Sequence, residues 1–453
     1  MNVFLLSMGC AKNTVDSERL AGRLASLGYR VVEEPEEAQV GIVNTCGFIQ
    51  DAVKENVDAI LDLEQMKDSG MLKHIVVAGC LVNRYEKELR QELPSVDLFA
   101  RSEDWDAVAD FLAGIEGKRD LSGGMSCGRM LLPLGTPWSR LLKVSEGCDS
   151  HCSYCAIPGI RGPLRSAPVE ALVEEALTLY VEGAREICLV GQDLTVYGQD
   201  LYGEPSLRRL ISELDRELPK GTWLRLLYLH PERVTRDLAD FLMGASKVLH
   251  YLDIPIQHIN DEILARMNRS PHRAGGRHIR DIFRYIREAD PLFALRTTLM
   301  TGFPGETESQ FDELLDFLEE AELDRAGAFI YSPEEGTPAA DFPNTVPQDV
   351  SEERCARLME LQSGISQRRG ELFIGRELDV LIEEADPEED TAWGRSYRDA
   401  PEVDGLVCVS GVGGAKPGEV LRARAVDCEE RDLFAEFVAP ASPAKSVIGR
   451  RVT

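Results

Sequence analysis

The sequence predicts an α/β protein of three consecutive parts. These are an N-terminal parallel α/β domain over residues 1–115, an open partial β/α barrel of TIM-like design over 138–372, and a small C-terminal antiparallel β-barrel over 373–442. The first two parts are predicted because short apolar runs alternate with segments of helical period. The third is predicted because the chain changes near residue 373 to short apolar runs separated by Gly, Pro and acidic turns. Residues 116–137 are expected to be a linker and 443–453 a tail.

Length and composition limit the class of protein. The 453 residues allow two or three domains, each with its own core. No apolar run approaches the ~20 residues that span a bilayer, and the start lacks the basic stretch of a secretory signal, so we expect a cytoplasmic protein with no membrane partner. In that compartment the 11 Cys are expected to be metal ligands or buried thiols rather than disulfides. The net charge of −28 favours a basic partner.

The N-terminal part repeats a strand, a cysteine-bearing turn and a helix. Parallel strands end at one edge of a sheet, so the cysteines at these turns are expected to converge although they lie 36 and 34 residues apart. Three thiolates suit a four-iron cluster with one open iron. The alternative is that each cysteine is a small buried residue. The predicted strands and their cysteines are 3–6 with Cys10, 40–43 with Cys46, and 75–78 with Cys80.

A second group of cysteines lies on one short loop after the apolar run 141–144. The sequence EGCDSHCSYCA (146–156) places Cys148, Cys152 and Cys155 in a CxxxCxxC array. A four-iron cluster usually takes four Cys ligands, and no fourth Cys is nearby, so one iron could stay open to a small molecule. The alternatives are zinc, with a fourth ligand such as His151, or a disulfide framework.

After this loop the strand and helix alternation resumes. Ser166 and Pro168 begin a helix, and further strands are predicted at 187–190, 223–229, 249–254, 295–300 and 326–331. Helices are predicted between these strands near 206–218, 235–245, 277–290 and 307–321. Six such units predict an open barrel that places its chemistry at the carboxyl ends of the strands.

The cysteine loop, with an aromatic residue before its last cysteine, resembles the radical S-adenosylmethionine (SAM) superfamily. The resemblance implies that the open iron chelates the amino and carboxylate groups of SAM, and that an injected electron cleaves SAM to a 5′-deoxyadenosyl radical. It also implies that the turn GQD (191–193) receives the amino group and that TGFPGE (301–306) approaches the adenosine, where glycine permits close contact. The residues assigned in this way to SAM are Tyr154, Gly191, Gln192, Asp193, Gly302, Gly305 and Glu306.

The N-terminal motifs GCAKN (9–13), NTCGFI (44–49) and GCL (79–81) resemble the methylthiotransferase family, and the C-terminal part resembles a TRAM domain. The resemblance implies two 4Fe-4S clusters. One SAM methylates sulfur on the N-terminal cluster, a second SAM is cleaved at the radical cluster, and the substrate radical captures the methylthio group. No catalytic residue beyond the six cluster cysteines is then required. The implied partners are an electron donor such as flavodoxin or ferredoxin, and a sulfur donor.

Other motifs resemble the branch that modifies the β-carbon of an aspartate in small-subunit ribosomal protein twelve, free or in the small ribosomal subunit. From 375 to 453 the chain has 10 Lys and Arg against 17 Asp and Glu, with an acidic run at 383–390. This charge suits a basic protein better than RNA, although such a run is often a solvated loop. The alternative branch modifies adenosine in tRNA. The motifs are AIP (156–158), IRG (160–162), YLDIPIQH (251–258), DRAGAF (324–329) and YSPEEGT (331–337).

Two functions of other classes stay open. A zinc-bearing RNA-binding scaffold would contain zinc instead of iron and sulfide, and a radical SAM methylase with purely structural N-terminal cysteines would transfer methyl without sulfur. Cys188 is expected in the core. No role is assigned to Cys127, Cys355, Cys408 or Cys428.

Overall fold

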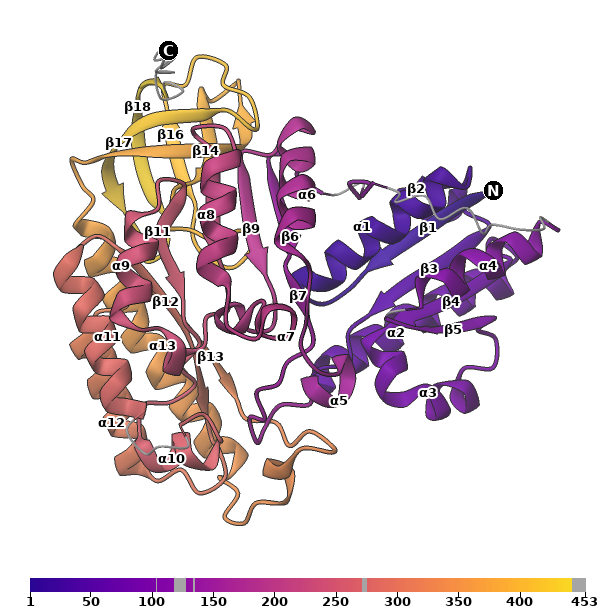
Figure 1. The fold of residues 1–453 in the computed structure, drawn as a ribbon, viewed down its shortest axis with the longest axis horizontal. Coiled ribbons are helices and arrows are strands. Elements are labelled where there is room, and N and C mark those ends of the chain that lie inside the picture. Colours follow the sequence, from indigo (N-terminus) through magenta and orange to yellow (C-terminus); the bar gives the residue numbers. More distant parts are fainter. Residues whose placement is uncertain (103, 118–127, 133–134, 271–274, 442–453) are drawn as a thin grey trace. The chain divides into compact units, whose positions relative to one another are not determined.

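The computed structural model describes residues 1–102, 104–117, 128–132, 135–270 and 275–441 (Figure 1). Within these residues the chain forms two compact units that do not follow chain order. The first unit contains Met1–Thr136, Glu146–Arg165 and Ser332–Ala340, and the second contains Pro137–Ser145, Ser166–Tyr331 and the chain from Asp341 onward. The CxxxCxxC loop therefore belongs to the same unit as the N-terminal sheet. Cys127, most of the predicted linker and the predicted tail lie outside the described residues.

The first unit is built on a parallel sheet of order β2-β1-β3-β4-β5, as predicted for the N-terminal part. β3 and β4 are almost wholly buried, which suits their Val-rich and Ile-rich sequences, because parallel strands are covered on both faces. The strands are β1 (Asn2–Ser7), β2 (Arg30–Val32), β3 (Val40–Thr45), β4 (His74–Gly79) and β5 (Leu98–Arg101). The helices are α1 (Ala11–Ser26), η1 (Pro35–Glu37), α2 (Gln50–Asp68), α3 (Cys80–Glu92), α4 (Trp105–Ile115) and α5 (Ile157–Arg161).

The second unit contains an open parallel sheet of order β13-β12-β11-β10-β9-β6, which confirms the expected α/β class. Its strands are β6 (Ser139–Lys143), β9 (Glu186–Val190), β10 (Trp223–Leu226), β11 (Val248–Asp253), β12 (Ala294–Thr301) and β13 (Arg325–Ile330). Its helices are α6 (Val169–Val181), η2 (Leu194–Val196), α7 (Gln199–Tyr202), α8 (Leu207–Glu217), η3 (Pro231–Arg233), α9 (Arg236–Gly244), α10 (Asp261–Arg266), α11 (Gly275–Ala289), α12 (Glu308–Ala321), η4 (Pro338–Asp341, at the boundary of the units) and α13 (Gln348–Glu371). Two short strands, β7 (Ser145–Glu146) and β8 (Arg165–Ser166), pair with each other. Cys188 is fully buried in β9, as expected.

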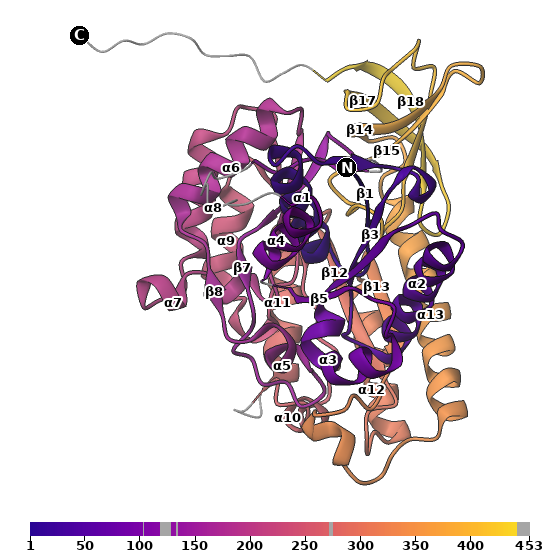
Figure 2. The ribbon, with the colours of Figure 1, turned by 90° about the vertical axis from the view of Figure 1, so that its right-hand side faces the viewer.

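The C-terminal part forms a closed barrel of order β14-β15-β16-β18-β17, again as predicted (Figure 2). Four strand pairs are antiparallel, but β16 and β18 close the barrel as a parallel pair. β15 occupies 391–395, and residues 396–399 after it make polar contacts within the second unit. The strands are β14 (Glu377–Asp386), β15 (Thr391–Arg395), β16 (Val407–Ser410), β17 (Val420–Cys428) and β18 (Leu433–Pro440).

Among the helices of the described residues, none has the length and apolar character to cross a membrane.

Candidate iron-sulfur and cofactor site

The three N-terminal cysteines lie at one edge of the first sheet. Cys10 follows β1 and caps α1, Cys46 follows β3, and Cys80 follows β4 and begins α3. Because β1, β3 and β4 are neighbours in the sheet, the structure brings these three cysteines together. The Oδ1 atom of Asn13 lies 3.9 Å from the sulfur of Cys10 and 3.9 Å from that of Cys80. The start of a helix favours a thiolate at Cys10 and Cys80.

Two glycines permit this close approach. Gly9 has φ +93°, and a Cβ there would lie 2.5 Å from the Cβ and 3.1 Å from the sulfur of Cys46. Gly79 has φ +102°, and its Cβ would lie 2.5 Å from the Oδ1 atom of Asn44. Both positions need the left-handed backbone and the missing side chain of glycine. The backbone conformation and the close packing at this edge of the sheet thus require glycine at positions 9 and 79.

Buried amides hold the turns that bear the cysteines. Asn13 donates from Nδ2 to the carbonyls of Met8, at 2.8 Å, and Thr45, at 2.9 Å. Asn44 donates from Nδ2 to the carbonyl of Asn13 at 3.0 Å. Asn13 and Asn44 are almost completely buried, so these hydrogen bonds satisfy groups that would otherwise destabilise the fold.

The charges near these cysteines favour the thiolate form unequally. Burial alone would raise the pKa of Cys10, but the positive charges of Lys12 and Arg161 and a backbone hydrogen bond bring its pKa below the ordinary value. Burial raises the pKa of Cys46. Burial also raises the pKa of Cys80, to about 11, although Arg161 lies beside it and opposes the shift. A metal that binds a thiol displaces its proton, so a bound cluster would hold all three as thiolates.

The CxxxCxxC loop is held by its own backbone in the first unit. The N–H of Cys148 donates to the carbonyl of Gly162 at 3.1 Å, and the N–H of Cys155 donates to the carbonyl of Cys152 at 3.1 Å. The N–H of Ser150 lies 3.3 Å from the sulfur of Cys148. Backbone N–H groups directed at sulfur are typical of iron-sulfur sites. Cys152 is buried, whereas Cys148 and Cys155 are half-buried.

A cavity of about 330 Å³ opens beside this loop within the first unit. The segment 332–340 passes next to it, because the N–H of Ala339 donates to the carbonyl of Ser153 at 2.8 Å. Arg84 anchors the same segment through Glu334, whose Oε2 lies 3.0 Å from Nη1. The cavity is lined by Asn83, Arg84, His151, Cys152, Cys155, Ala156, Pro158, Gly159, Ile160, Glu335, Gly336 and Pro338.

The donor set fits four-iron clusters. None of the ten described cysteines forms a disulfide bond, so the disulfide alternative finds no support among them. In the described part of the chain, no group of three or more His, Cys, Asp or Glu side chains is close enough to hold a single metal ion. A four-iron cluster is bound at its corners and takes thiolates that stand further apart. Each of the two trios supplies three thiols, one fewer than the four Cys that usually hold such a cluster.

The residues assigned to the amino group of SAM lie in the second unit, at the carboxyl end of β9. A Cβ on Gly191 would lie 2.7 Å from the Oγ atom of Ser145, so the chain's own packing requires this glycine. Asp193 accepts from the N–H of Thr195 at 2.8 Å, and its other oxygen lies 2.6 Å from Nη1 of Arg233. Both oxygens of Asp193 thus have partners within the chain. A role of Gln192 and Asp193 toward SAM stays a prediction.

The turn 301–306 follows β12 and is closed by the buried carboxylate of Glu306. One oxygen accepts from the N–H of Gly302 at 2.7 Å and from Nη1 of Arg354 at 2.9 Å, and the other lies 3.2 Å from Nε2 of His258. A Cβ on Gly302 would lie 2.1 Å from the Oγ atom of Ser351. These contacts give the turn a structural reason for its glycine and its carboxylate, and its role toward adenosine stays a prediction.

The structure therefore brings the six predicted cysteines and the half-buried Tyr154 into one unit, and places Gly191, Gln192, Asp193, Gly302, Gly305 and Glu306 in the other. Sequence reasoning missed the roles of Asn13, Arg84 and Arg161. A signal was available for Asn13 and Arg161, because both lie inside the motifs GCAKN and IRG.

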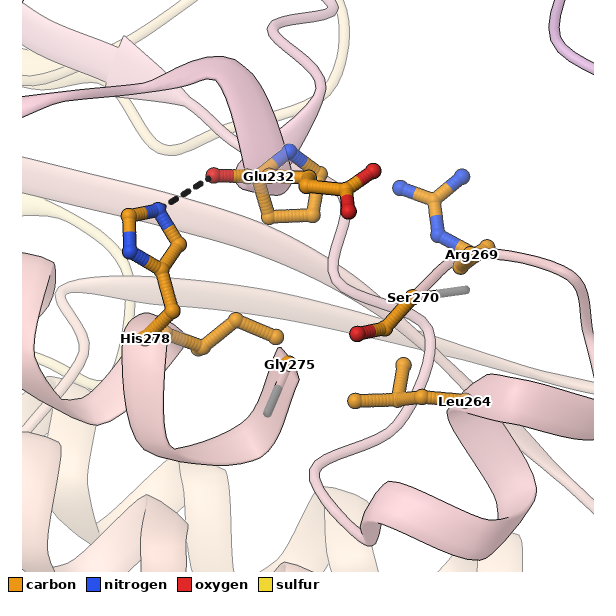
Figure 3. Close-up of a pocket in the computed structure, with 8 residues that line it drawn as sticks. Glu232, Leu264, Arg269, Ser270, Gly275 and His278 are labelled. Atoms are coloured by element: carbon orange, nitrogen blue, oxygen red, sulfur yellow. Dashed lines mark hydrogen bonds between the residues drawn. The ribbon is translucent and has the colours of Figure 1, made fainter. Parts of the chain in front are cut away.

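A separate cavity of about 220 Å³ lies in the second unit (Figure 3). Nε2 of His278 donates to the carbonyl of Pro231 at 3.2 Å across it. Its described lining contains no cysteine and no residue assigned to SAM, so we do not include it in the candidate site. The lining residues are Pro231, Glu232, Leu264, Arg269, Ser270, Gly275, His278 and Ile279.

Comparisons with known proteins match three successive parts of the chain, and the radical SAM match includes residues of both units. Residues 2–100 match an uncharacterized protein family, UPF0004, residues 142–318 match the radical SAM superfamily, and residues 374–438 match the TRAM domain. Among solved structures, the radical SAM methyltransferase TsrM from Kitasatospora setae, with cobalamin and a [4Fe-4S] cluster bound, is similar with a TM-score of 0.53 and 16% identity. The alignment covers 75% of this chain and 76% of that one. This likeness shows the fold alone.

The fold and the cysteine motifs define a radical SAM enzyme of the methylthiotransferase type, with SAM and iron-sulfur cofactors. Among curated proteins, the ribosomal protein uS12 methylthiotransferase RimO of Geobacter sulfurreducens is 42% identical over 96% of this chain and 98% of its own length. That of Aquifex aeolicus is 41% identical over 96% of both chains. The chain belongs to the RimO family.

Proposed function

We propose that the protein methylthiolates the β-carbon of an aspartate in ribosomal protein uS12, with two 4Fe-4S clusters and two molecules of SAM. The observation that carries this proposal is that two separate trios of cysteines, each short of the usual four ligands, lie in one unit of the structure. The names of the curated relatives support the substrate.

When bound, the clusters supply an electron for the cleavage of SAM and a site for the transferred sulfur. The chain's own residues bind and orient these groups. Cys148, Cys152 and Cys155 would hold the radical cluster, and Cys10, Cys46 and Cys80 the sulfur-carrying cluster. No side chain acts as a general base, because the substrate loses a hydrogen atom and not a proton.

The charge of the C-terminal barrel supports a basic protein as substrate. The turn between β14 and β15 exposes an acidic run, and the barrel region as a whole is acidic. Such a surface attracts a basic ribosomal protein and repels the phosphates of RNA. The exposed carboxylates at the end of β14 belong to Glu384 and Asp386, and those of the turn belong to Glu388, Glu389 and Asp390.

The remaining components are part of the same proposal. The electron donor is a flavodoxin or ferredoxin, a separate donor replaces the sulfur, and the reaction takes place in the cytoplasm, where ribosomes are found.

The test is an anaerobic reaction of the reconstituted enzyme with SAM, a reductant, sulfide and either purified uS12, small ribosomal subunits or tRNA. Mass spectrometry should find a methylthio group on one aspartate of uS12 and leave tRNA unchanged. A modified adenosine in tRNA with an unmodified aspartate in uS12 would overturn the proposed substrate. Methyl without sulfur on the product, or zinc in place of iron and labile sulfide in the protein, would overturn the reaction itself.

A further inference from the structure

Arg161 links the two cysteine groups of the first unit. It ends α5, six residues after Cys155, and α5 packs against α3, the helix that begins at Cys80 (Figures 1 and 2). Its side chain is only 2% exposed. The Nε–H group donates to the sulfur of Cys80 at 2.9 Å. Arg161, which follows the CxxxCxxC loop, thus contacts Cys80, a predicted ligand of the N-terminal cluster.

The other N–H groups of Arg161 fix its position. Nη1 donates to Asp16 Oδ2 at 3.0 Å and to Glu146 Oε2 at 3.0 Å, and Nη2 donates to the Oδ1 atom of Asn13. Asp16 and Asn13 come from α1, whereas Glu146 lies two residues before Cys148. The planar guanidinium therefore holds three segments together in one geometry, which a lysine cannot reproduce.

The positive charge of Arg161 lies beside the N-terminal cysteines. Its Nε atom is 2.9 Å from the sulfur of Cys80, and its Nη2 atom donates to the Oδ1 atom of Asn13, which is 3.9 Å from the sulfurs of both Cys10 and Cys80. A cation that is fixed and buried beside a cluster stabilises negative charge more strongly than a solvated one, because the surroundings screen it less. A hydrogen bond to a ligand sulfur acts in the same direction.

We propose that Arg161 is a positioning residue that raises the reduction potential of the cluster on Cys10, Cys46 and Cys80 and fixes the CxxxCxxC segment to that cluster. A one-electron reduction adds one negative charge to a cluster, and Arg161 stabilises the form that carries this charge. The inference rests on the proposed function, which places a cluster on these three cysteines.

The test uses the full chain with Cys148, Cys152 and Cys155 replaced by Ala, so that only the N-terminal cluster remains. This background and its Arg161→Lys and Arg161→Met variants are reconstituted with iron and sulfide, and iron is counted. The potential is then measured by reduction with dithionite, followed by electron paramagnetic resonance. We expect the potential to fall in Arg161→Met and to fall less in Arg161→Lys, which keeps the charge but loses the Nε–H bond.

Arg84→Lys in the same background is the matched control. The side chain of Arg84 is 8% exposed, and its hydrogen bonds go to Glu334 and to backbone carbonyls of the first unit, with none to a sulfur in the described structure. The N-terminal cluster of the Arg84→Lys variant should have the same reduction potential as that of the background. If Arg161→Met fails to bind iron, the reduction potential of Arg161→Lys is compared with that of the background, and a lower value supports the inference.

Equal potentials in the background and in the Arg161 variants, with iron retained, would overturn this inference alone. A background that binds no iron would overturn the proposed function and this inference with it.

Discussion

The carboxyl edge of the first sheet and the amino edge of the second are both buried and polar, but they use charge differently. At the first edge Arg161 divides its hydrogen bonds between carboxylates and the sulfur of Cys80. At the second, Glu186 of β9 accepts from Arg225 Nε at 2.7 Å and from Arg395 Nη2 at 2.6 Å, and all three side chains are at most 1% exposed.

The second network holds the C-terminal barrel on the sheet. Arg395 ends β15, and Arg225 also donates to the carbonyl of Tyr397 at 2.9 Å, so strands β9 and β10 are joined to the barrel by buried charges. Charges that are fully matched in this way act as structure, because loss of one partner leaves the others buried without compensation. A buried charge shared with candidate metal ligands can in addition change the chemistry of the metal. Glu186, Arg225 and Arg395 thus hold the fold, whereas Arg161 also contacts a candidate metal ligand.

The largest expected effect comes from the first edge. In the Cys10/Cys46/Cys80 triple Ala variant we expect no methylthio product and a loss of about half the iron, because one of two four-iron clusters is removed. Iron and labile sulfide per chain, together with mass spectrometry of the product, measure this. Cys188→Ala is the control, since that thiol is buried in β9 in the core of the second unit, and this variant should keep all of its iron. Full iron content in the triple variant would contradict the second cluster.

A substitution at the second edge should lower the free energy of unfolding and leave the iron content unchanged. Glu186→Gln leaves Arg225 and Arg395 buried with one negative charge fewer, so we expect a loss of about 3–5 kcal/mol in the free energy of unfolding. Urea unfolding followed by circular dichroism measures it. Glu320→Gln is the matched control, because Glu320 forms exposed ion pairs with Arg280 and Arg284 and should cost at most ~1 kcal/mol. A loss of iron in Glu186→Gln would contradict the prediction that the second edge affects stability alone.

Low pH should weaken the same contact. Burial would raise the pKa of Glu186, but Arg225 and Arg395 outweigh it and lower the pKa to about 2. A lowered folded-state pKa gives stability that is present above the unfolded-state pKa and is lost as the pH falls toward 2. Between pH 6 and pH 3 the wild type should therefore lose about 2 kcal/mol more than Glu186→Gln. Parallel stability curves for the two proteins would contradict this assignment.

The smallest effect tests the close approach at the first edge. Gly9→Ala and Gly28→Ala both put a side chain on a left-handed backbone, at φ +93° and +84°, and each should cost about 1–2 kcal/mol. Only the new Cβ at Gly9 would meet Cys46, whereas the one at Gly28 has nothing within 4 Å. Iron content should therefore fall in Gly9→Ala and stay unchanged in Gly28→Ala. Equal iron in the two variants would show that Cys46 tolerates displacement.

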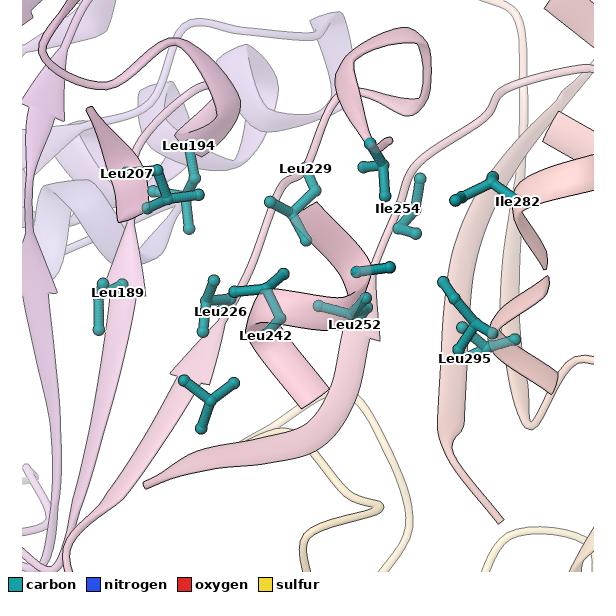
Figure 4. Close-up of a cluster of buried hydrophobic side chains, with 14 of the residues drawn as sticks. Leu189, Leu194, Leu207, Leu226, Leu229, Leu242, Leu252, Ile254, Ile282 and Leu295 are labelled. Atoms are coloured by element: carbon teal, nitrogen blue, oxygen red, sulfur yellow. The ribbon is translucent and has the colours of Figure 1, made fainter. Parts of the chain in front are cut away.

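Sequence patterns predicted most of the strands because the periodicity of buried residues is local. Leu189, Leu226, Leu252 and Leu295 lie on successive strands of the second sheet, pair in register and are fully buried (Figure 4). Each such leucine contributes about 1.5–3 kcal/mol when removed from water, so apolar runs of this kind are strongly selected as strands.

The helix α13 was not predicted, and its composition explains why. Its buried side includes Ser351, Arg354, Gln362 and Arg369, which do not give an apolar stripe. Arg354, Gln362 and Arg369 can be buried because each has a partner on another element of the unit, as Arg369 has in Asp324, 3.2 Å away. Such partners are distant in sequence and cannot be found from periodicity.

The sequence by itself determined the α/β class, the two cysteine trios and the barrel, because strand periodicity, ligand spacing and turn residues are properties of short segments. Only the tertiary structure decided that the CxxxCxxC loop shares a unit with Cys10, Cys46 and Cys80, and that Arg161 contacts Cys80. These facts depend on contacts between residues far apart in sequence, such as Arg161 and Cys80, which are 81 residues apart. The energy of a buried charge is fixed by the neighbours that folding brings to it.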